Sequence, residues 1–246
     1  MTAEHRNFPQ FFITAPTPCP YLPGQVERKV FTHLLGPDPR ALNNQLSQSG
    51  FRRSQNIAYR PGCESCNACS STRIPVDSFE WTKSFKRVLK DNVDLVAGIA
   101  NPLATQEHYD LFRGYIDTRH SDGGMADMSA LDFASMIDET MVDTRLVEYR
   151  FAKSHPQGGQ LAAAVLIDIL QDGISLIYSF YDTCEPARSL GSFVILDCIT
   201  RVKRLGLPYL YLGYFVEGSP KMTYKGRFLP QERLAQNGWQ LHSRKP

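Results

Sequence analysis

Three cysteines occur at the spacing C-x-x-C-x-x-C: Cys63, Cys66 and Cys69. Thiols separated by two residues in a loop can point at one centre, which predicts either a soft-metal site or redox-active thiols. Cys19, between Pro18 and Pro20, is the candidate for a fourth ligand, because rigid prolines present its side chain from a loop. A structural zinc ion, an iron–sulfur cluster and a site without an ion all stay open.

The composition is that of a folded protein without a membrane anchor. The 246 residues, 42% of them hydrophobic, suffice for one large domain or two modest ones. No stretch approaches the roughly 18 apolar residues of a membrane span, and the first residues lack an apolar signal run, so we expect a cytoplasmic protein. Six cysteines are too few for a disulfide scaffold, and Cys184 and Cys198, set among apolar residues, are expected to be buried.

The positive charge is concentrated in one segment, residues 40–90. Its basic residues outnumber its acidic ones nine to three. The basic residues are Arg40, Arg52, Arg53, Arg60, Arg73, Lys83, Lys86, Arg87 and Lys90. Basic residues interspersed with aromatic ones favour a phosphate-rich partner, although a solvated basic face has the same composition.

Residues 1–100 predict a compact N-terminal module that carries the cysteines. The expected elements are extended chain over 1–35 with a strand from Val26 to Leu35, a helix from Ala41 to Ser49, a strand over 51–60, and a helix from Trp81 to Asp91 capped by Asp77 or Ser78. The cysteine loop lies between the second strand and the second helix.

Residues 101–246 predict two helices followed by a sheet. The expected elements are helices over 105–119 and 129–141, strands over 146–152, 160–170 and 175–181, a helix over 193–205 and a strand over 208–216. The residues from Gln171 to Ile174 are a hairpin signal. The whole chain therefore predicts an α+β fold with a mixed, mainly antiparallel sheet.

The turn from Arg188 to Ser192 precedes the helix expected over 193–205. Free backbone N–H groups and the helix dipole of this turn, which contains Gly191, would attract a phosphate, with Arg188 adding a full charge. Capping by Ser189 or Ser192 is the plainer interpretation. The order of elements is similar to the GNAT acyltransferases, in which this turn binds the phosphates of an acyl carrier.

Several further motifs together resemble one family. They are Pro18-Cys19-Pro20-Tyr21-Leu22-Pro23, Gly50-Phe51-Arg52-Arg53-Ser54, Tyr59 through Cys69, Ser179-Phe180-Tyr181-Asp182, Arg188-Ser189-Leu190-Gly191, Tyr209 through Tyr214, and Lys221-Met222-Thr223-Tyr224-Lys225. In this order the chain resembles the bacterial leucyl-tRNA–protein transferases, which are similar to the eukaryotic arginyl-tRNA–protein transferases. The resemblance covers nearly the whole chain.

The resemblance implies transfer of leucine from leucyl-tRNA to proteins whose N-terminal residue is Asp or Glu. The product would enter the N-degron route to proteolysis. It also implies a cysteine-bearing module over 1–100 and a GNAT-like domain over 101–246, with no cofactor needed for the chemistry.

The chemistry of such a transfer needs positioning, oxyanion stabilisation and one proton acceptor. Tyr178, Asp182 and Tyr214 lie on expected strands or strand ends around the acyl site, where a hydroxyl or a carboxylate can relay the proton. Ordinary strand aromatics and a turn aspartate are the alternative interpretation of these three residues.

Two sets of basic and aromatic residues complete the predicted site. Lys221, Tyr224 and Lys225, with Arg188 and Gly191, are the candidates for binding the tRNA 3′ end, since lysine neutralises phosphate and tyrosine stacks on adenine. An acidic acceptor needs a cation, for which the candidates are Arg52, Arg53, Arg73 and Arg119.

Three other functions fit part of the sequence. An arginyl-tRNA donor is open, because nothing in the composition distinguishes leucine from arginine. An acyl-CoA-dependent N-acyltransferase would share the phosphate-binding turn but have no use for a basic N-terminal module. A zinc-knuckle RNA-binding protein would use the cysteines and the charge but leave the Arg188 turn without a role.

Overall fold

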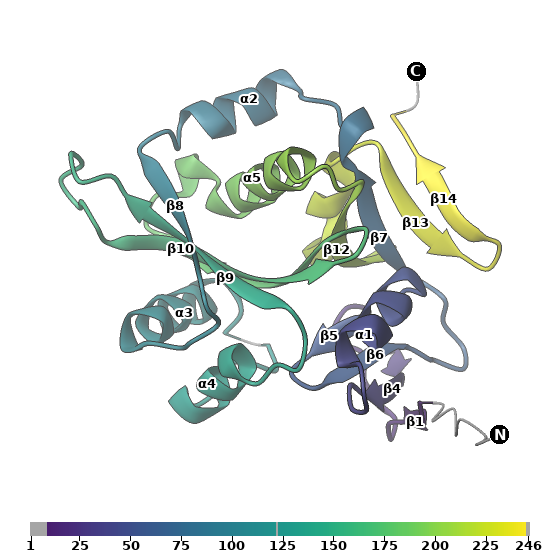
Figure 1. Ribbon diagram of the computed structural model, residues 1–246. Coiled ribbons are helices and arrows are strands. Elements are labelled where there is room, and N and C mark those ends of the chain that lie inside the picture. Colours follow the sequence, from purple (N-terminus) through teal and green to yellow (C-terminus); the bar gives the residue numbers. More distant parts are fainter. Residues whose placement is uncertain (1–8, 122, 245–246) are drawn as a thin grey trace, which may run out of the picture.

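The computed structural model of the chain describes residues 9–121 and 123–244 (Figure 1). The first elements are β1 (Phe12–Ile13), β2 (Thr17–Pro18), β3 (Val26–Glu27), β4 (Lys29–His33), α1 (Pro39–Gln48), β5 (Arg52–Ser54), β6 (Ile57–Pro61), β7 (Cys69–Pro75), η1 (Val76–Ser78), α2 (Lys83–Lys90) and β8 (Leu95–Ala100). The later elements are α3 (Gln106–Arg119), α4 (Ala130–Asp138), β9 (Thr144–Phe151), β10 (Leu161–Leu170), β11 (Gly173–Tyr181), η2 (Pro186–Arg188), α5 (Leu190–Arg204), β12 (Tyr209–Val216), η3 (Pro220–Arg227), β13 (Gln231–Ala235) and β14 (Gly238–His242).

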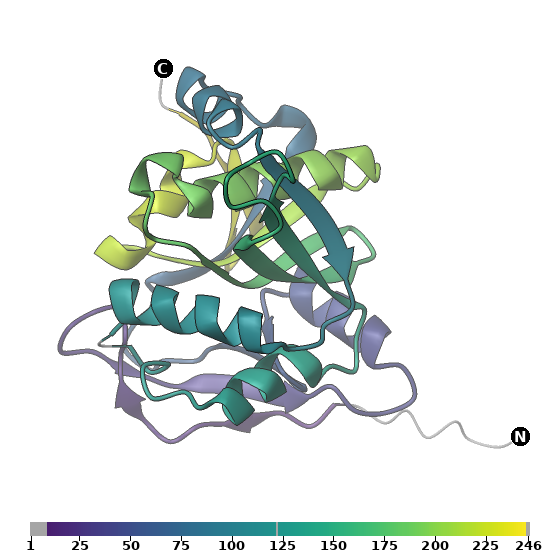
Figure 2. The same ribbon diagram turned by 90° about the vertical axis from the view of Figure 1, so that its left-hand side faces the viewer.

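An eight-stranded sheet forms the centre of the fold, in the order β14-β13-β7-β12-β11-β10-β9-β8. Its neighbours run antiparallel, except for the parallel pair β11 and β12. Helices α2 and α5 cover one face (Figure 1). Figure 2 shows α3, α4 and the N-terminal strands together on the other face. The predicted α+β fold with a mixed, mainly antiparallel sheet is therefore confirmed.

The N-terminal strands form a smaller sheet, in the order β1-β4-β6-β5, and a two-stranded ribbon of β2 and β3. The prediction of one strand from Val26 to Leu35 is wrong in detail. Its first part, β3, pairs with β2, whereas its second part, β4, pairs with β1 and β6. The change of partner between Glu27 and Lys29 ends the first strand.

Helices α3 and α4 begin within one residue of where the sequence predicts them. Thr105 and Ser129 accept the backbone N–H of His108 and Asp132 at the starts of α3 and α4. The start of α2 differs from the prediction, because Thr82, and not Asp77 or Ser78, caps this helix.

The residues before Thr82 explain that difference. Phe79 is buried, and the backbone N–H of Glu80 donates to the carbonyl of Leu229. These contacts hold the chain out of the helix up to Thr82, so that the helix starts two residues later than predicted.

Two apolar clusters fill the two sides of the central sheet. One lies beneath α5, around Leu196 and Val202 of that helix and Val165 of β10. The other lies beneath α3 and α4, around Phe112 and Phe133. The predicted hairpin joins β10 and β11 through a two-residue turn at residues 171–172 and is confirmed. None of the helices in the described part of the chain has the length and apolarity to span a membrane.

The central sheet draws strands from both of the predicted modules. β7 and β8, which precede residue 101, are two of its eight strands. The two modules are therefore linked through shared backbone pairing, and the boundary at residue 100 stays a prediction.

Candidate functional site

The parallel strands β11 and β12 separate soon after they begin. They pair only over residues 173–175 of β11 and 209–211 of β12. Beyond that point β11 shifts register against β10 at Ile177, and β12 shifts register against β7 at Leu212. Each shift is a β-bulge, which turns backbone groups out of the regular ladder. The strands thus create an opening in the middle of the sheet, which we call the strand opening.

The side chain of Arg52 bridges the strand opening from β5. Its Nη2 donates to the carbonyl oxygens of Leu176 at 2.8 Å and Ile177 at 2.9 Å. Its guanidinium also lies against Gly213 of β12, where an added Cβ would be 1.3 Å from Nη1. Gly213 has φ of +76°, a backbone conformation that favours glycine. Arg52 therefore contacts both separated strands.

Arg53, the next residue, points the other way and forms a buried ion pair. Its Nε lies 2.6 Å from Oδ2 of Asp168, and both side chains are 1% exposed. Thr144 adds a third hydrogen bond to the same carboxylate. Alternation along β5 places the two arginines on opposite faces. Arg53, predicted as an acceptor-binding residue, is thus engaged within the protein.

The other two predicted acceptor arginines lie apart from the strand opening. The Nε of Arg73 donates to Glu232 at 2.6 Å, and its guanidinium is stacked over the rings of Tyr209 and Trp239. Arg119 is exposed at the last residue of α3. Of the four arginines, only Arg52 reaches the strand opening.

The structure places the three predicted catalytic residues at different points. Tyr178 follows the bulge of β11 and packs beside Phe112, and burial raises the pKa of its hydroxyl. Asp182 follows the end of β11, and its carboxylate accepts the backbone N–H of Cys184. Tyr214 donates its hydroxyl to the carbonyls of Gly50 and Tyr59, at 3.0 and 2.9 Å.

Burial also raises the pKa of Tyr214. Both tyrosine hydroxyls therefore keep their protons at neutral pH. Among the described residues, Tyr214 forms no hydrogen bond or ring contact with Tyr178 or Asp182.

The predicted phosphate turn before α5 is engaged with its surroundings. Arg188 donates from Nη1 and Nη2 to the two oxygens of Asp94, each at 2.8 Å, and from Nε to Glu185 at 2.9 Å. The ring of Tyr181 lies across Gly191, where an added Cβ would be 2.9 Å from the hydroxyl oxygen. Arg188 is therefore paired with acids of the described chain, and Tyr181 covers Gly191.

Ser189 begins α5 without a side-chain cap and has φ of +51°. The plainer interpretation of this turn as a serine cap therefore does not hold for Ser189.

The three residues of the Lys221 motif lie in different surroundings on η3. Lys221 is exposed, and Tyr224 is 47% exposed, although burial of its hydroxyl raises the pKa of this group. Lys225 is buried and its Nζ donates to the carbonyl of Tyr214 at 2.7 Å. Burial, with a smaller contribution from the charge of Arg52, lowers the pKa of Lys225 to about 7. Lys225 thus faces the interior, and the other two face solvent.

The four cysteines predicted as ligands line one small cavity of about 70 Å³. These are Cys19, Cys63, Cys66 and Cys69, together with Tyr21, Tyr59 and Tyr214 among others. Burial, and then the neighbouring thiols, raises the pKa of Cys69 to about 11. The donors are of the type that soft metals prefer. As the side chains stand, however, no three His, Cys, Asp or Glu residues of the described chain are arranged to hold a metal ion.

The remaining two cysteines differ from each other. Cys198, a residue of α5, is fully buried, as predicted. Cys184 is exposed, so that prediction is wrong. It lies in the exposed loop after β11, where its backbone N–H donates to the carboxylate of Asp182.

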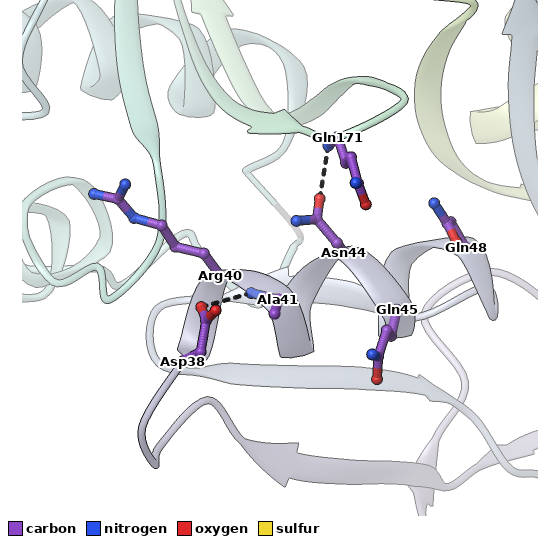
Figure 3. A pocket seen from close by; sticks show the side chains of 7 residues that line it. All are labelled: Asp38, Arg40, Ala41, Asn44, Gln45, Gln48 and Gln171. Carbon is purple, nitrogen blue, oxygen red and sulfur yellow. Dashed lines mark hydrogen bonds between the residues drawn. The ribbon is translucent and has the colours of Figure 1, made fainter.

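A larger hollow of about 410 Å³ lies beside α1, on another part of the surface (Figure 3). Its lining is polar and consists of Asp38, Arg40, Ala41, Asn44, Gln45, Gln48 and Gln171. Asn44 accepts the backbone N–H of Gln171 at 2.8 Å, which ties α1 to the β10–β11 turn. None of the predicted site residues lines this hollow.

Sequence reasoning missed Gly213 and the acids that engage the arginines. Gly213 stands in the run Tyr209 through Tyr214, where a glycine inside a strand signals a bulge or a close approach. Asp168, Asp94 and Glu232 are far in sequence from the arginines they bind, so no local pattern identifies them.

Comparison with known proteins assigns the family. The family model of the arginine-tRNA-protein transferase C terminus matches residues 107–235, and that of the N terminus matches residues 17–87. The aspartate/glutamate leucyltransferase of Azorhizobium caulinodans is 57% identical over 98% of both chains. That of Afipia carboxidovorans is 56% identical over 97% of this chain and 95% of its own length.

Among solved structures, FemX is similar at 10% identity over 74% of this chain and 61% of that chain, with a TM-score of 0.46. This similarity is too low to add to the assignment. The matches to the two family models and the full-length relatives show that the chain belongs to the arginine-tRNA-protein transferase family and, within it, groups with the aspartate/glutamate leucyltransferases.

Proposed function

We propose that this protein transfers leucine from leucyl-tRNA to the N-terminal α-amine of proteins that begin with Asp or Glu. The observation that carries the proposal is identity above half of all positions, over nearly the full length, with relatives named aspartate/glutamate leucyltransferase. The product would be a substrate of N-degron-dependent proteolysis in the cytoplasm.

In the reaction, the α-amine nitrogen of the acceptor attacks the carbonyl carbon of the leucyl ester. An amide bond forms, the ester C–O bond breaks, and the 3′-terminal ribose hydroxyl of the tRNA leaves. The amine loses one proton and the leaving oxygen gains one. Because the ester is already activated, the protein has to position the two substrates, stabilise the oxyanion and relay a proton.

Tyr178 and Asp182 fit these two chemical roles. The raised pKa of Tyr178 keeps its hydroxyl protonated, which suits donation to the oxyanion. Asp182, partly exposed after the end of β11, supplies a carboxylate that can accept the proton of the amine. Tyr214 donates to two backbone carbonyls, which supports a role in holding β12 against the N-terminal module.

For the donor tRNA we propose a surface that includes Lys221 and Tyr224. Both side chains are accessible, so lysine can neutralise a phosphate and tyrosine can stack on the terminal adenine. Arg188, Gly191 and Lys225 would act indirectly, by supporting the start of α5 and the backbone of β12.

The cysteine cavity stays a candidate site for a structural metal or iron–sulfur cluster. Its four thiols have suitable chemistry, and a cation would stabilise their thiolate forms. Such a group would hold the N-terminal module together, and no step of the transfer depends on it.

The engaged turn before α5 argues against acyl-CoA as the donor. An acyl carrier would have to displace Tyr181 from Gly191 and compete with Asp94 for Arg188. The second candidate for the donor is arginyl-tRNA, because both matching family models describe arginine-tRNA-protein transferases.

Donor use tests the proposal. The protein is incubated with a peptide beginning with Asp and with labelled leucyl-tRNA, arginyl-tRNA or acetyl-CoA in separate reactions. We expect labelled peptide with leucyl-tRNA only. Labelling with arginyl-tRNA alone would assign the other donor, and labelling with acetyl-CoA would overturn the proposal.

A further inference from the structure

Arg52 differs from the other arginines of the interior in lacking an acid. Arg53, Arg73 and Arg188 each form an ion pair with Asp or Glu. Within the described ranges, Arg52 bonds only to the carbonyls of Leu176 and Ile177. Both bonds use Nη2, so Nε and Nη1 have no hydrogen-bond partner among the described residues.

A partly buried cation without an acid partner loses hydration without full compensation. Lys225, close enough for the charge of Arg52 to act on it, is in a similar position, since its Nζ bonds only to a carbonyl. No Asp or Glu in the part of the chain that the structure describes forms an ion pair with either residue. Arg52 thus carries a positive charge that no acid of the described chain balances, and this charge is complementary to an anionic ligand.

The location of Arg52 favours the acceptor as that ligand. Ile177, whose carbonyl Arg52 binds at 2.9 Å, directly precedes Tyr178 in β11. A carboxylate held at Arg52 would therefore lie beside the residue proposed to stabilise the oxyanion. An N-terminal Asp or Glu carries its carboxylate and its α-amine on the same residue, so fixing one positions the other.

We propose that Arg52 binds the side-chain carboxylate of the N-terminal Asp or Glu, and that Gly213 is the positioning residue that admits Arg52 to the strand opening. The proposal rests on the proposed function and deepens it, since it selects Arg52 from four candidate arginines. The two carbonyls of the β11 bulge fix the guanidinium, and the bare Cα of Gly213 provides the space.

Replacing Gly213 by alanine tests the positioning role. The new Cβ would overlap the guanidinium, at 1.3 Å from Nη1, and force Arg52 out of the opening. Gly206→Ala is the matched control, because Gly206 has a similar φ of +70° but no atom within 4 Å of an added Cβ. The control reproduces the backbone strain without displacing Arg52.

The measurement is direct binding of labelled peptides that differ only in an N-terminal Asp or Asn, without tRNA. The wild-type protein and Gly206→Ala should bind the Asp peptide more tightly than the Asn peptide. Gly213→Ala and Arg52→Gln should weaken binding of the Asp peptide by about ten- to a hundredfold and leave the Asn peptide nearly unchanged. Arg52→Gln keeps the inference testable if Gly213→Ala does not fold.

Two results would overturn this inference. One is that Arg52→Gln keeps the preference for Asp over Asn. The other is that it weakens binding of leucyl-tRNA, with a lower salt dependence, while peptide binding is unaltered, which would assign Arg52 to the donor. Because binding is measured without transfer, a failure of the proposed reaction is recognised separately, as the absence of leucine on any peptide.

Discussion

Replacing Asp168 by alanine removes the only carboxylate bonded to Arg53 among the residues described. The wild-type carboxylate accepts hydrogen bonds from Nε at 2.6 Å, from Nη2 at 2.8 Å and from the Thr144 hydroxyl at 2.8 Å. The side chains of Arg53 and Asp168 are each 1% exposed. The variant therefore leaves a buried cation that neither water nor an acid compensates.

Loss of one member of a buried ion pair costs about 3–5 kcal/mol in the free energy of unfolding. Asp117→Ala is the matched control, since Asp117 pairs with Arg113 at 2.6 Å but its side chain is 62% exposed. That exposed pair should contribute about 0–1 kcal/mol. The double variant Arg53→Ala/Asp168→Ala should lose less than the sum of the two single losses, because neither charge is then left alone.

Urea unfolding at equilibrium measures all of these free energies, with the slope against urea checked for each variant. A loss for Asp168→Ala no larger than that for Asp117→Ala would refute the reasoning. The pair would then not hold β5 against β10.

Three further predictions follow from the site. Because burial and then Arg52 lower the pKa of Lys225 from 10.5 to about 7, the unfolded chain binds more protons between these values. Stability should therefore rise with pH through that window, by up to about 1.4 kcal/mol per unit, and urea unfolding should show this slope lost in Lys225→Met. Lys221→Ala should weaken leucyl-tRNA binding and reduce its salt slope by about one unit, measured by titration at several salt concentrations, whereas an unchanged slope would remove Lys221 from the tRNA surface. Cys66→Ser should lower the melting temperature together with any metal content after anaerobic purification, and metal-free protein with an unaltered variant would contradict ligation.

The elements with strong local signals could be predicted from the sequence. The two-residue turn between β10 and β11, the helices after Thr105 and Ser129, and the buried strand β12 each depend on turn, cap or apolar patterns within a few residues. The start of α2 could not, because the backbone bond of Glu80 to Leu229 depends on tertiary contact.

The candidate site was predictable only in part. The sequence motifs predict that four cysteines lie close together, and in the structure all four line one cavity. The sequence does not show which of Arg52 and Arg53 faces the candidate site, although alternation along a strand requires that their side chains point to opposite faces. Which of them meets an acid depends on Asp168, more than a hundred residues later in the chain.

The central claim concerns both the residue that is transferred and the acceptor that receives it. Mass spectrometry of peptides incubated with leucyl-tRNA and the protein tests both at once, using peptides that begin with Asp, Glu, Asn or Ala. We predict one leucine on the α-amine of the Asp and Glu peptides and little on the Asn and Ala peptides, because the cation of the acceptor site would be left unpaired. Equal leucine addition to all four peptides, or none to any, would contradict the account.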